Sequence, residues 1–144
     1  MRSRLIAGLL LAAAGCAPLP PEAGGNKELV VSFYTTVFIQ KKVAEGFADY
    51  VGTTYIQHNP RVPDGPEAAV KLLSQAITPD SLSEIRRVVA EGDLVVLHIH
   101  SRANPTDRGR AIVDIFRVEN GKIVEHWDVI QDVPEKAANE NTMF

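Results

Sequence analysis

Five titratable side chains interrupt apolar strand or loop patterns and are therefore the first candidates for chemistry: His58, His98, His100, Asp114 and His126. Asp114 stands within Ala-Ile-Val-Asp-Ile-Phe, a β-strand pattern in which aspartate is disfavoured. Burial among such neighbours would raise the pKa of Asp114, which suits a general base or a neutral hydrogen-bond donor. The alternative is an aspartate at a strand edge, facing solvent or paired with Arg117 or Arg86. The apolar neighbours favour a pocket.

Two of the histidines, His98 and His100, are two positions apart on a predicted strand, so both project to the same side. This is a recurring metal-ligand spacing, which His58 and Asp128 could supplement. The pair could instead be catalytic or substrate-orienting imidazoles, or one buried histidine and one at a wet rim. Since no HExxH or cysteine-based ligand pattern supports a metal, we expect neither a metal nor a cofactor.

Several further side chains are candidates for substrate binding. His58 follows Tyr55 in a predicted loop, and loops over a rigid sheet often supply binding residues, although Asn-Pro could equally form a plain turn. Of the neighbours His126 and Trp127, whichever faces inward would line a cavity, and the other would face outward or a subunit contact. Tyr34 and Tyr55 could donate a hydroxyl hydrogen to a substrate carbonyl, or fill the helix-sheet interface.

A predicted β-hairpin around Asn120-Gly121 positions most of these residues. A tight two-residue turn would place Asp114 opposite Trp127. A type I turn with Gly121 as a G1 bulge would place Asp114 opposite His126, with Asp128 two residues further on. We favour the bulge, because it gathers the titratable residues on one face.

The remaining pattern predicts an α+β domain. Apolar residues at helical spacing predict helices over residues 27–39, 43–50 and 66–77. Alternating patterns predict strands over 82–90 and 94–102, joined by a tight turn, and then the hairpin over 109–131. Helices first and an antiparallel meander afterwards indicate helices packed on one face of a curved sheet. Such a sheet leaves a cone-shaped hollow, where apolar pockets with a few polar groups commonly form.

Composition sets the class of protein. The chain has 144 residues, of which 45% are hydrophobic and 23% charged, and this fits one globular domain. The formal net charge is -3 and there is no basic cluster, which argues against nucleic acid as a partner.

The N-terminal residues 1–15 are typical of a secretory signal peptide, with a basic start and an apolar run too short to span a bilayer. Small residues directly before Cys16 resemble the lipobox of bacterial lipoproteins. We therefore expect acylation of Cys16, residues 16–25 as a flexible tether, and a lipid-anchored protein at the periplasmic or extracytoplasmic face of the cell envelope. The alternative is an ordinary signal peptide with an incidental cysteine.

From Lys27 to Phe144 the sequence resembles the SnoaL-like polyketide cyclase group of the nuclear transport factor 2-like superfamily. Within that group it most resembles the SnoaL-like proteins predicted to catalyse aldol condensation. Four motifs in order carry the resemblance: Tyr55-Ile-Gln-His-Asn-Pro60, Glu91-Gly-Asp-Leu-Val-Val-Leu-His98, the hairpin, and Asn141-Thr-Met-Phe144. The resemblance implies a cone-shaped fold for residues 26–144 and, by analogy, a homodimer formed through the outer face of the sheet.

The resemblance also implies roles for individual residues. Asp114 falls where SnoaL cyclases keep their acid/base aspartate, and where ketosteroid isomerases of this fold keep an oxyanion-binding aspartic acid. His98 falls on the strand where polyketide cyclases place a histidine near the substrate. The separate base aspartate of the isomerases has no clear counterpart here, which argues against isomerase activity.

We therefore expect a cofactor-free cyclase or lyase that catalyses an aldol-type condensation of a small carbonyl compound. In this hypothesis Asp114 removes a proton alpha to the carbonyl, and His98 stabilises the enolate with help from His58 or a tyrosine. The residues expected to bind substrate are His100, His126, Tyr55, Tyr34, Trp127 and Asp128.

Two other hypotheses use the same residues. The first is a non-catalytic envelope lipoprotein that binds a small hydrophobic ligand in the same pocket. The second is a metal-dependent site built on His98 and His100.

Overall fold

The structure is a computed structural model, and it describes residues 23–144. The predicted signal peptide, the predicted acylation at Cys16 and most of the predicted tether lie outside the described residues. Within residues 23–144, no helix is long and apolar enough to cross a membrane.

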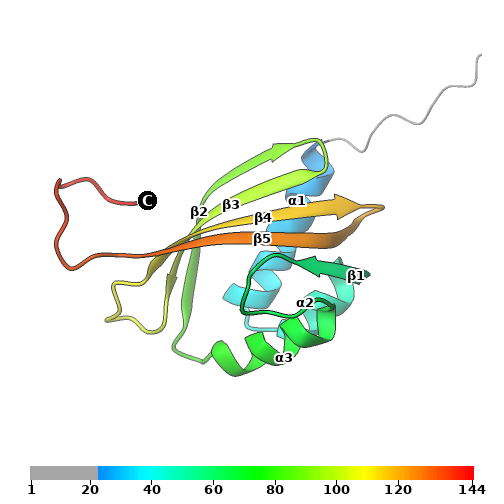
Figure 1. Ribbon diagram of the computed structural model, residues 1–144, viewed down its shortest axis with the longest axis horizontal. Helices are drawn as coiled ribbons and strands as arrows, with labels where there is room; N and C mark the ends of the chain where they lie inside the picture. Colours follow the sequence, from blue (N-terminus) through cyan, green and yellow to red (C-terminus); the bar gives the residue numbers. More distant parts are fainter. Residues whose placement is uncertain (1–22) are drawn as a thin grey trace, which may run out of the picture.

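The helices form one layer that covers one face of the sheet (Figure 1). They are α1 (Ala23–Tyr34), which continues into a π-helical turn η1 (Thr35–Ile39), α2 (Val43–Tyr50) and α3 (Pro66–Ala76). The predicted helix over 27–39 is thus an α-helix that ends in a π-helical turn. Gly46 explains how closely α2 approaches η1, because a Cβ at this position would collide with the side chain of Val37.

The second layer is a five-stranded curved sheet with the strand order β1-β5-β4-β3-β2. The strands are β1 (Val51–Gln57), β2 (Leu82–Glu91), β3 (Leu94–Arg102), β4 (Arg110–Glu119) and β5 (Lys122–Asp132). The predicted α+β architecture, with three helices on a curved sheet, is confirmed. The sequence pattern missed β1, which pairs in parallel with β5, so the sheet is not wholly antiparallel. Gly52 allows the β1 backbone to lie close against the side chain of Val124.

The register of the β4–β5 hairpin differs from both predicted registers. Asn120 and Gly121 have φ values of 51° and 72°, so they form a two-residue turn with both residues in the left-handed region. A bulge occurs further along, where the register shifts between Arg117 and Val118. As a result, Asp114 lies opposite Asp128. The favoured bulge at the turn was therefore wrong.

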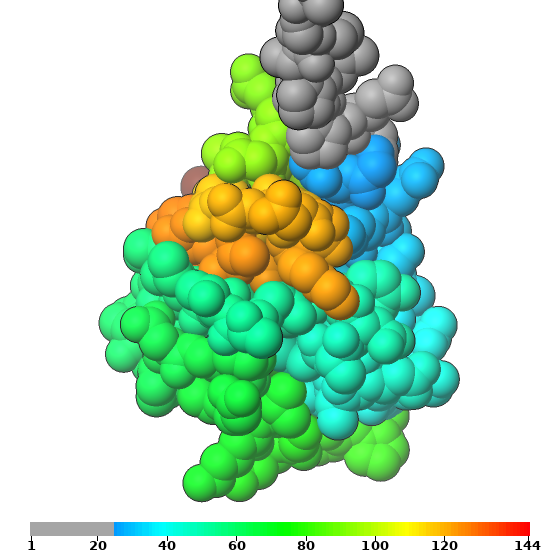
Figure 2. All heavy atoms as spheres, turned by 90° about the vertical axis from the view of Figure 1, so that its right-hand side faces the viewer, coloured from blue at the N-terminus to red at the C-terminus, as the bar shows by residue number. Residues whose placement is uncertain are grey.

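The aromatic core joins the two layers. The Phe33 ring makes edge-on contacts with Phe47, at a centroid distance of 5.3 Å, and with Phe116, at 5.6 Å. All three rings are buried, and aromatic side chains contribute much of the apolar area in such a core. At the turn of the β4–β5 hairpin, Lys122 Nζ donates to the Asp49 carbonyl at 2.6 Å. Figure 2 shows this turn lying against β1 and α2, which cover this end of the cone.

Gly109, directly before β4, lies close to the backbone of β3. Its φ is 81°, and a Cβ would collide with the Ser101 carbonyl, whereas Gly92, with φ 59°, has open space around it. We expect Gly92→Ala to cost about 1 kcal/mol, which is the penalty for a left-handed alanine. Gly109→Ala should cost about 3 kcal/mol or more, because steric strain adds to that penalty. Urea unfolding of both variants measures the difference, and equal losses would contradict it.

Candidate active site

A cavity of about 360 Å³ lies between the concave face of the sheet and the helices. This volume suits a small molecule. Its walls are largely apolar and come from η1, the loop after β1, α3 and β4: Phe38, Val62, Leu72, Leu73 and Ile112. Its polar groups come mostly from the strands, and its apolar walls come mostly from the helices and the loop after β1.

The centre of the site is a buried contact between Asp114 on β4 and His126 on β5. His126 Nε2 lies 3.2 Å from Asp114 Oδ1, and only 7% of Asp114 is exposed. Burial raises the pKa of the Asp114 carboxyl, and the nearby charge of Asp128 adds to this effect, while His126 opposes it. The pocket predicted for Asp114 is therefore present, and burial makes its carboxylate more basic than an exposed one.

Gln57, on β1, determines where the protons of this pair lie. Its Oε1 accepts a hydrogen bond from the backbone N–H of Asn59 at 2.9 Å, which identifies that atom as the oxygen. His126 Nδ1 lies 2.9 Å from the same oxygen and must therefore carry a hydrogen that it donates. The opposite nitrogen, Nε2, then shares a single proton with Asp114. Gln57 thus orients the acid/base pair.

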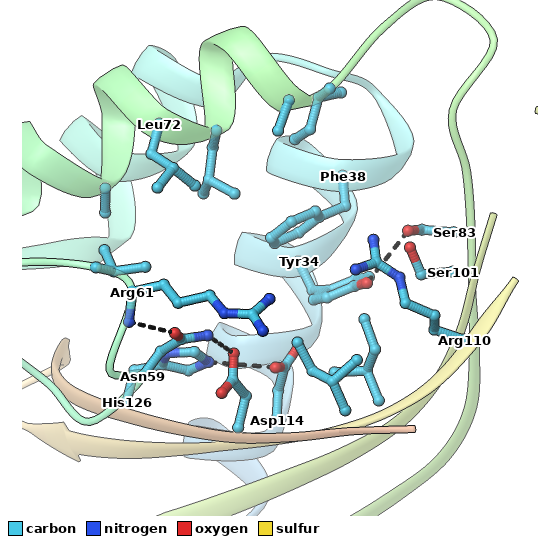
Figure 3. A pocket seen from close by; sticks show the side chains of 18 of the residues that line it. Tyr34, Phe38, Asn59, Arg61, Leu72, Ser83, Ser101, Arg110, Asp114 and His126 are labelled. Carbon is cyan, nitrogen blue, oxygen red and sulfur yellow. Dashed lines mark hydrogen bonds and ion pairs between the residues drawn. The ribbon is translucent and has the colours of Figure 1, made fainter. Parts of the chain in front are cut away.

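The loop after β1 is bound to the floor of the cavity. Asn59 Nδ2 donates to Asp128 Oδ2 at 2.6 Å, and Asn59 Oδ1 accepts from the backbone N–H of Arg61 at 2.9 Å. These bonds place the Arg61 side chain over the Asp114–His126 pair (Figure 3).

The two candidate tyrosines also line the cavity and are buried. The Tyr34 hydroxyl donates to Ser83 Oγ at 3.3 Å. Burial raises the pKa of both Tyr34 and Tyr55, and the negative charge of Asp114 adds to the shift. Both hydroxyls therefore stay protonated at neutral pH, and the hydrogen of the Tyr34 hydroxyl is donated to Ser83.

His98 and His100 do not reach this cavity. Leu97 is the β3 residue opposite Asp114, and because side chains alternate along a strand, His98 points to the convex face beside Val113. There His98 Nδ1 lies 3.0 Å from Arg87 Nη1, and both histidine rings stack on Phe144, the last residue of the chain. The predicted placement of His98 next to the reacting carbonyl was wrong.

His58 and Trp127 lie on the convex face as well. Their rings stack at a centroid distance of 4.5 Å, and His58 Nε2 lies 2.8 Å from Glu125 Oε1. Of the pair His126 and Trp127, it is therefore His126 that faces the cavity. Asp128 also faces it, which confirms that Asp114, His126 and Asp128 share one face.

The only group in the described part of the chain whose geometry could hold a metal ion is not the predicted one. Asp114, His126 and Asp128 have ligand atoms within 4.8 Å of one another. Two carboxylates and an imidazole are ordinary ligands of divalent ions. In this arrangement the same atoms are bonded to each other and to Asn59. The predicted cluster of His98, His100, His58 and Asp128 is divided between the two faces of the sheet.

The sequence patterns missed several polar residues of the cavity: Gln57, Arg61, Ser83, Ser101 and Arg110. A signal existed for Arg110, because it precedes Asp114 by four residues on the same strand and therefore shares its face. No comparable signal marks Gln57, since β1 itself was not predicted.

These features define a cone-shaped α+β domain with a buried acid/base pair in a small-molecule cavity. The chain belongs to the family of SnoaL-like domains, whose model matches residues 30–126. No curated protein matches the chain in sequence.

Solved structures of nuclear transport factor 2-like proteins share the fold. A candidate ketosteroid isomerase from Kribbella flavida superposes with a TM-score of 0.66 at 15% identity, covering 81% of this chain and 84% of its own. A nuclear transport factor 2-like protein of unknown function from Burkholderia xenovorans gives 0.65 at 17% identity, covering 80% and 89%. A candidate polyketide cyclase from Bacillus cereus gives 0.61 at 23% identity, covering 76% of each chain. At these identities the likeness establishes the fold alone.

Nitrogen NMR of histidine tests the role of Gln57. Near neutral pH we expect His126 Nδ1 to show the chemical shift of a protonated nitrogen, because Gln57 Oε1 accepts its hydrogen. In Gln57→Leu this acceptor is lost, and the Nδ1 shift should move toward the unprotonated value as the proton settles on Nε2. Gln131→Leu, at an exposed position on β5, is the matched control and should leave the spectrum unchanged. An unprotonated Nδ1 in the wild type would rule out this assignment.

The raised pKa of Asp114 also predicts a pH dependence of stability. The unfolded chain loses this proton near the ordinary aspartate pKa of about 3.9, whereas the folded protein keeps it to higher pH. The wild type should therefore lose stability relative to Asp114→Asn as pH rises through this window. Urea unfolding of both proteins over a pH series measures the difference between their free energies of unfolding. The contributions of the other carboxylates are the same in both proteins and cancel in this difference. A difference that stays constant or grows with pH would count against a buried, protonated Asp114.

Proposed function

We propose that this protein is a cofactor-free cyclase or lyase that catalyses an aldol-type condensation of a small carbonyl compound. The observation that carries the proposal is the buried Asp114–His126 pair, which lines a small apolar cavity. A carboxylate with a raised pKa is suited to removing a proton from carbon, because catalytic efficiency increases as the pKa of the base approaches the working pH.

The proposed reaction begins with proton transfer to Asp114. Asp114 Oδ1 faces His126, and Oδ2 has no hydrogen-bond partner among the described residues, so Oδ2 is the atom that would accept the alpha proton. The electron pair of the C–H bond moves into an enolate. The enolate carbon then attacks a second carbonyl carbon, and the resulting alkoxide takes back a proton from the Asp114–His126 pair. The protons balance without a cofactor.

The enolate oxygen must be stabilised by a group other than the predicted His98 and His58. His98 and His58 are on the convex face and take no part in this mechanism. The Arg61 guanidinium lies over the Asp114–His126 pair and makes no hydrogen bond to another described residue, so it is the donor available to the enolate oxygen (Figure 3). Donors aimed at a developing negative charge in a site that excludes water are the most effective stabilisers of such a transition state.

Two further proposals concern the location of the protein in the cell and its oligomeric state. Acylation of Cys16 and a location in the cell envelope are supported by the sequence before the domain. A homodimer through the convex face is supported by two exposed apolar side chains on that face, Val89 at 63% and Val129 at 67% exposure.

The second candidate function is non-catalytic binding of a small hydrophobic ligand in the same cavity. The apolar walls formed by η1 and α3 favour it. A binder would need the cavity but would not need a base, and this difference makes the two functions separable.

Hydrogen–deuterium exchange at carbon tests the catalytic proposal. We expect the wild type to accelerate alpha-proton exchange in a panel of small β-keto esters and ketones, followed by proton NMR in deuterated water. Asp114→Asn should lower this rate by about 10²- to 10⁴-fold, because it removes the base. The matched control is Asp80→Asn, which makes the same change at an exposed position outside the cavity.

The outcomes separate the two functions. Loss of exchange in Asp114→Asn with unchanged affinity for the same ketones supports catalysis. Ketones that bind without any acceleration of exchange by the wild type would overturn it and favour the binding module.

A further inference from the structure

Arg61 and Arg110 differ from the other arginines of residues 23–144 in having no bonded partner for their guanidinium groups. Neither group makes a hydrogen bond or an ion pair with another described residue. Each of the others does so: Arg86 and Arg102 with Glu84, Arg87 with His98, Arg108 with the Val133 carbonyl, and Arg117 with Glu125. The two exceptions both line the cavity.

These two arginines reach the cavity from different elements. Arg61 follows β1, and Arg110 begins β4. Both also line a second, smaller hollow together with Asp132, which places them at one mouth. In Figure 3 the Arg61 guanidinium lies over the Asp114–His126 pair, and Arg110 lies beside Tyr34, Ser83 and Ser101.

The surroundings of Arg110 form a polar row across three strands. Ser83 on β2 is paired with Ser101 on β3, and Ser101 is paired with Arg110 on β4. Cross-strand neighbours of this kind are about 5 Å apart. Since the Tyr34 hydroxyl donates to Ser83 Oγ, the hydrogen of the Ser83 hydroxyl is free to be donated into the cavity. The row therefore offers hydroxyl and guanidinium donors to one acceptor group.

The charges of the cavity leave this row positive. Asp114 and His126 share one proton and are neutral as a pair. Arg102 is paired with Glu84, and among residues 23–144 Asp128 is the one carboxylate besides Asp114 that lines the cavity with Arg61 and Arg110, without an ion pair to either. Two arginines and one carboxylate therefore leave one formal positive charge in the cavity, and Asp132, opposite Arg110 on β5, makes no ion pair with it. One uncompensated positive charge suits a monoanion better than a dianion.

We propose that the substrate is a small oxo acid whose carboxylate binds to Arg110, Ser83 and Ser101. A guanidinium fork and two hydroxyls match the geometry of a carboxylate. Arg110 and Asp114 are four residues apart on β4, which corresponds to about 13 Å along the strand. A substrate bound at Arg110 can therefore present its carbonyl end to Asp114 through a chain of several carbons, along the apolar wall. The inference rests on the proposed function for the identity of the reacting end.

Equilibrium binding tests the carboxylate site without any turnover. The probes are straight-chain monocarboxylates from butanoate to decanoate, the amides of the same acids as neutral analogues, and hexyl phosphate as the alternative anion. Titration calorimetry should show tighter binding of a carboxylate than of its amide by about tenfold or more, because a charge-assisted bond is lost. Arg110→Gln should reduce the affinity for the carboxylate to that for the amide. Arg108→Gln, two residues away and outside the cavity, is the matched control and should keep the preference.

Each result bears on the proposal. It is overturned if carboxylates and amides bind the wild type equally, if no carboxylate of the series binds, if Arg110→Gln keeps the preference, or if hexyl phosphate binds more tightly than hexanoate. Asp114→Asn should retain the carboxylate preference. A carboxylate preference without any acceleration of alpha-proton exchange would therefore leave the anion site standing and overturn only the catalytic function.

Discussion

One shared proton between Asp114 and His126 is the interaction on which the site depends. The helices bury it, and burial gives the carboxyl its raised pKa. The β4–β5 bulge brings the two residues to one face. Gln57, from a strand at the edge of the sheet, leaves only Nε2 to face Asp114. Each layer of the fold therefore contributes to the basicity of one carboxylate, although only two strands carry the reacting groups.

Much of the architecture could be predicted, because it follows from local patterns. The 3.6-residue apolar period indicated the helices, alternation indicated β2 to β5, and an aspartate among apolar neighbours indicated a pocket. β1 was missed because it is short and begins next to a glycine, and because its parallel pairing to β5 depends on contacts that are distant in sequence. The hairpin register was wrong because a bulge away from the turn leaves no clear mark in the sequence.

The histidines show where reasoning from single residues fails. His98 seemed suited to the site by type and by its strand, yet which face a strand residue occupies depends on its register with β4. Leu97 faces inward, so His98 faces outward and stacks near the C-terminal Phe144. Arginines at loop and strand ends resemble solvated surface residues in any sequence. Arg61 and Arg110 become informative only when the fold brings them to one cavity and leaves them without partners.

Because β1 is an edge strand, the site could lose its structure while the rest of the domain stays folded. β1 pairs with β5 alone, and it carries Gln57 and leads into Asn59, the two residues that bind His126 and Asp128. If β1 undocked, the β2–β5 meander would keep its pairing, but both supports of the acid/base pair would be lost together. The free energy of this local opening, which lies at or below that of global unfolding, would then limit the fraction of molecules able to react. A measurement of overall folding would therefore overestimate the fraction of molecules that are able to react. The difference between the two fractions would grow with temperature.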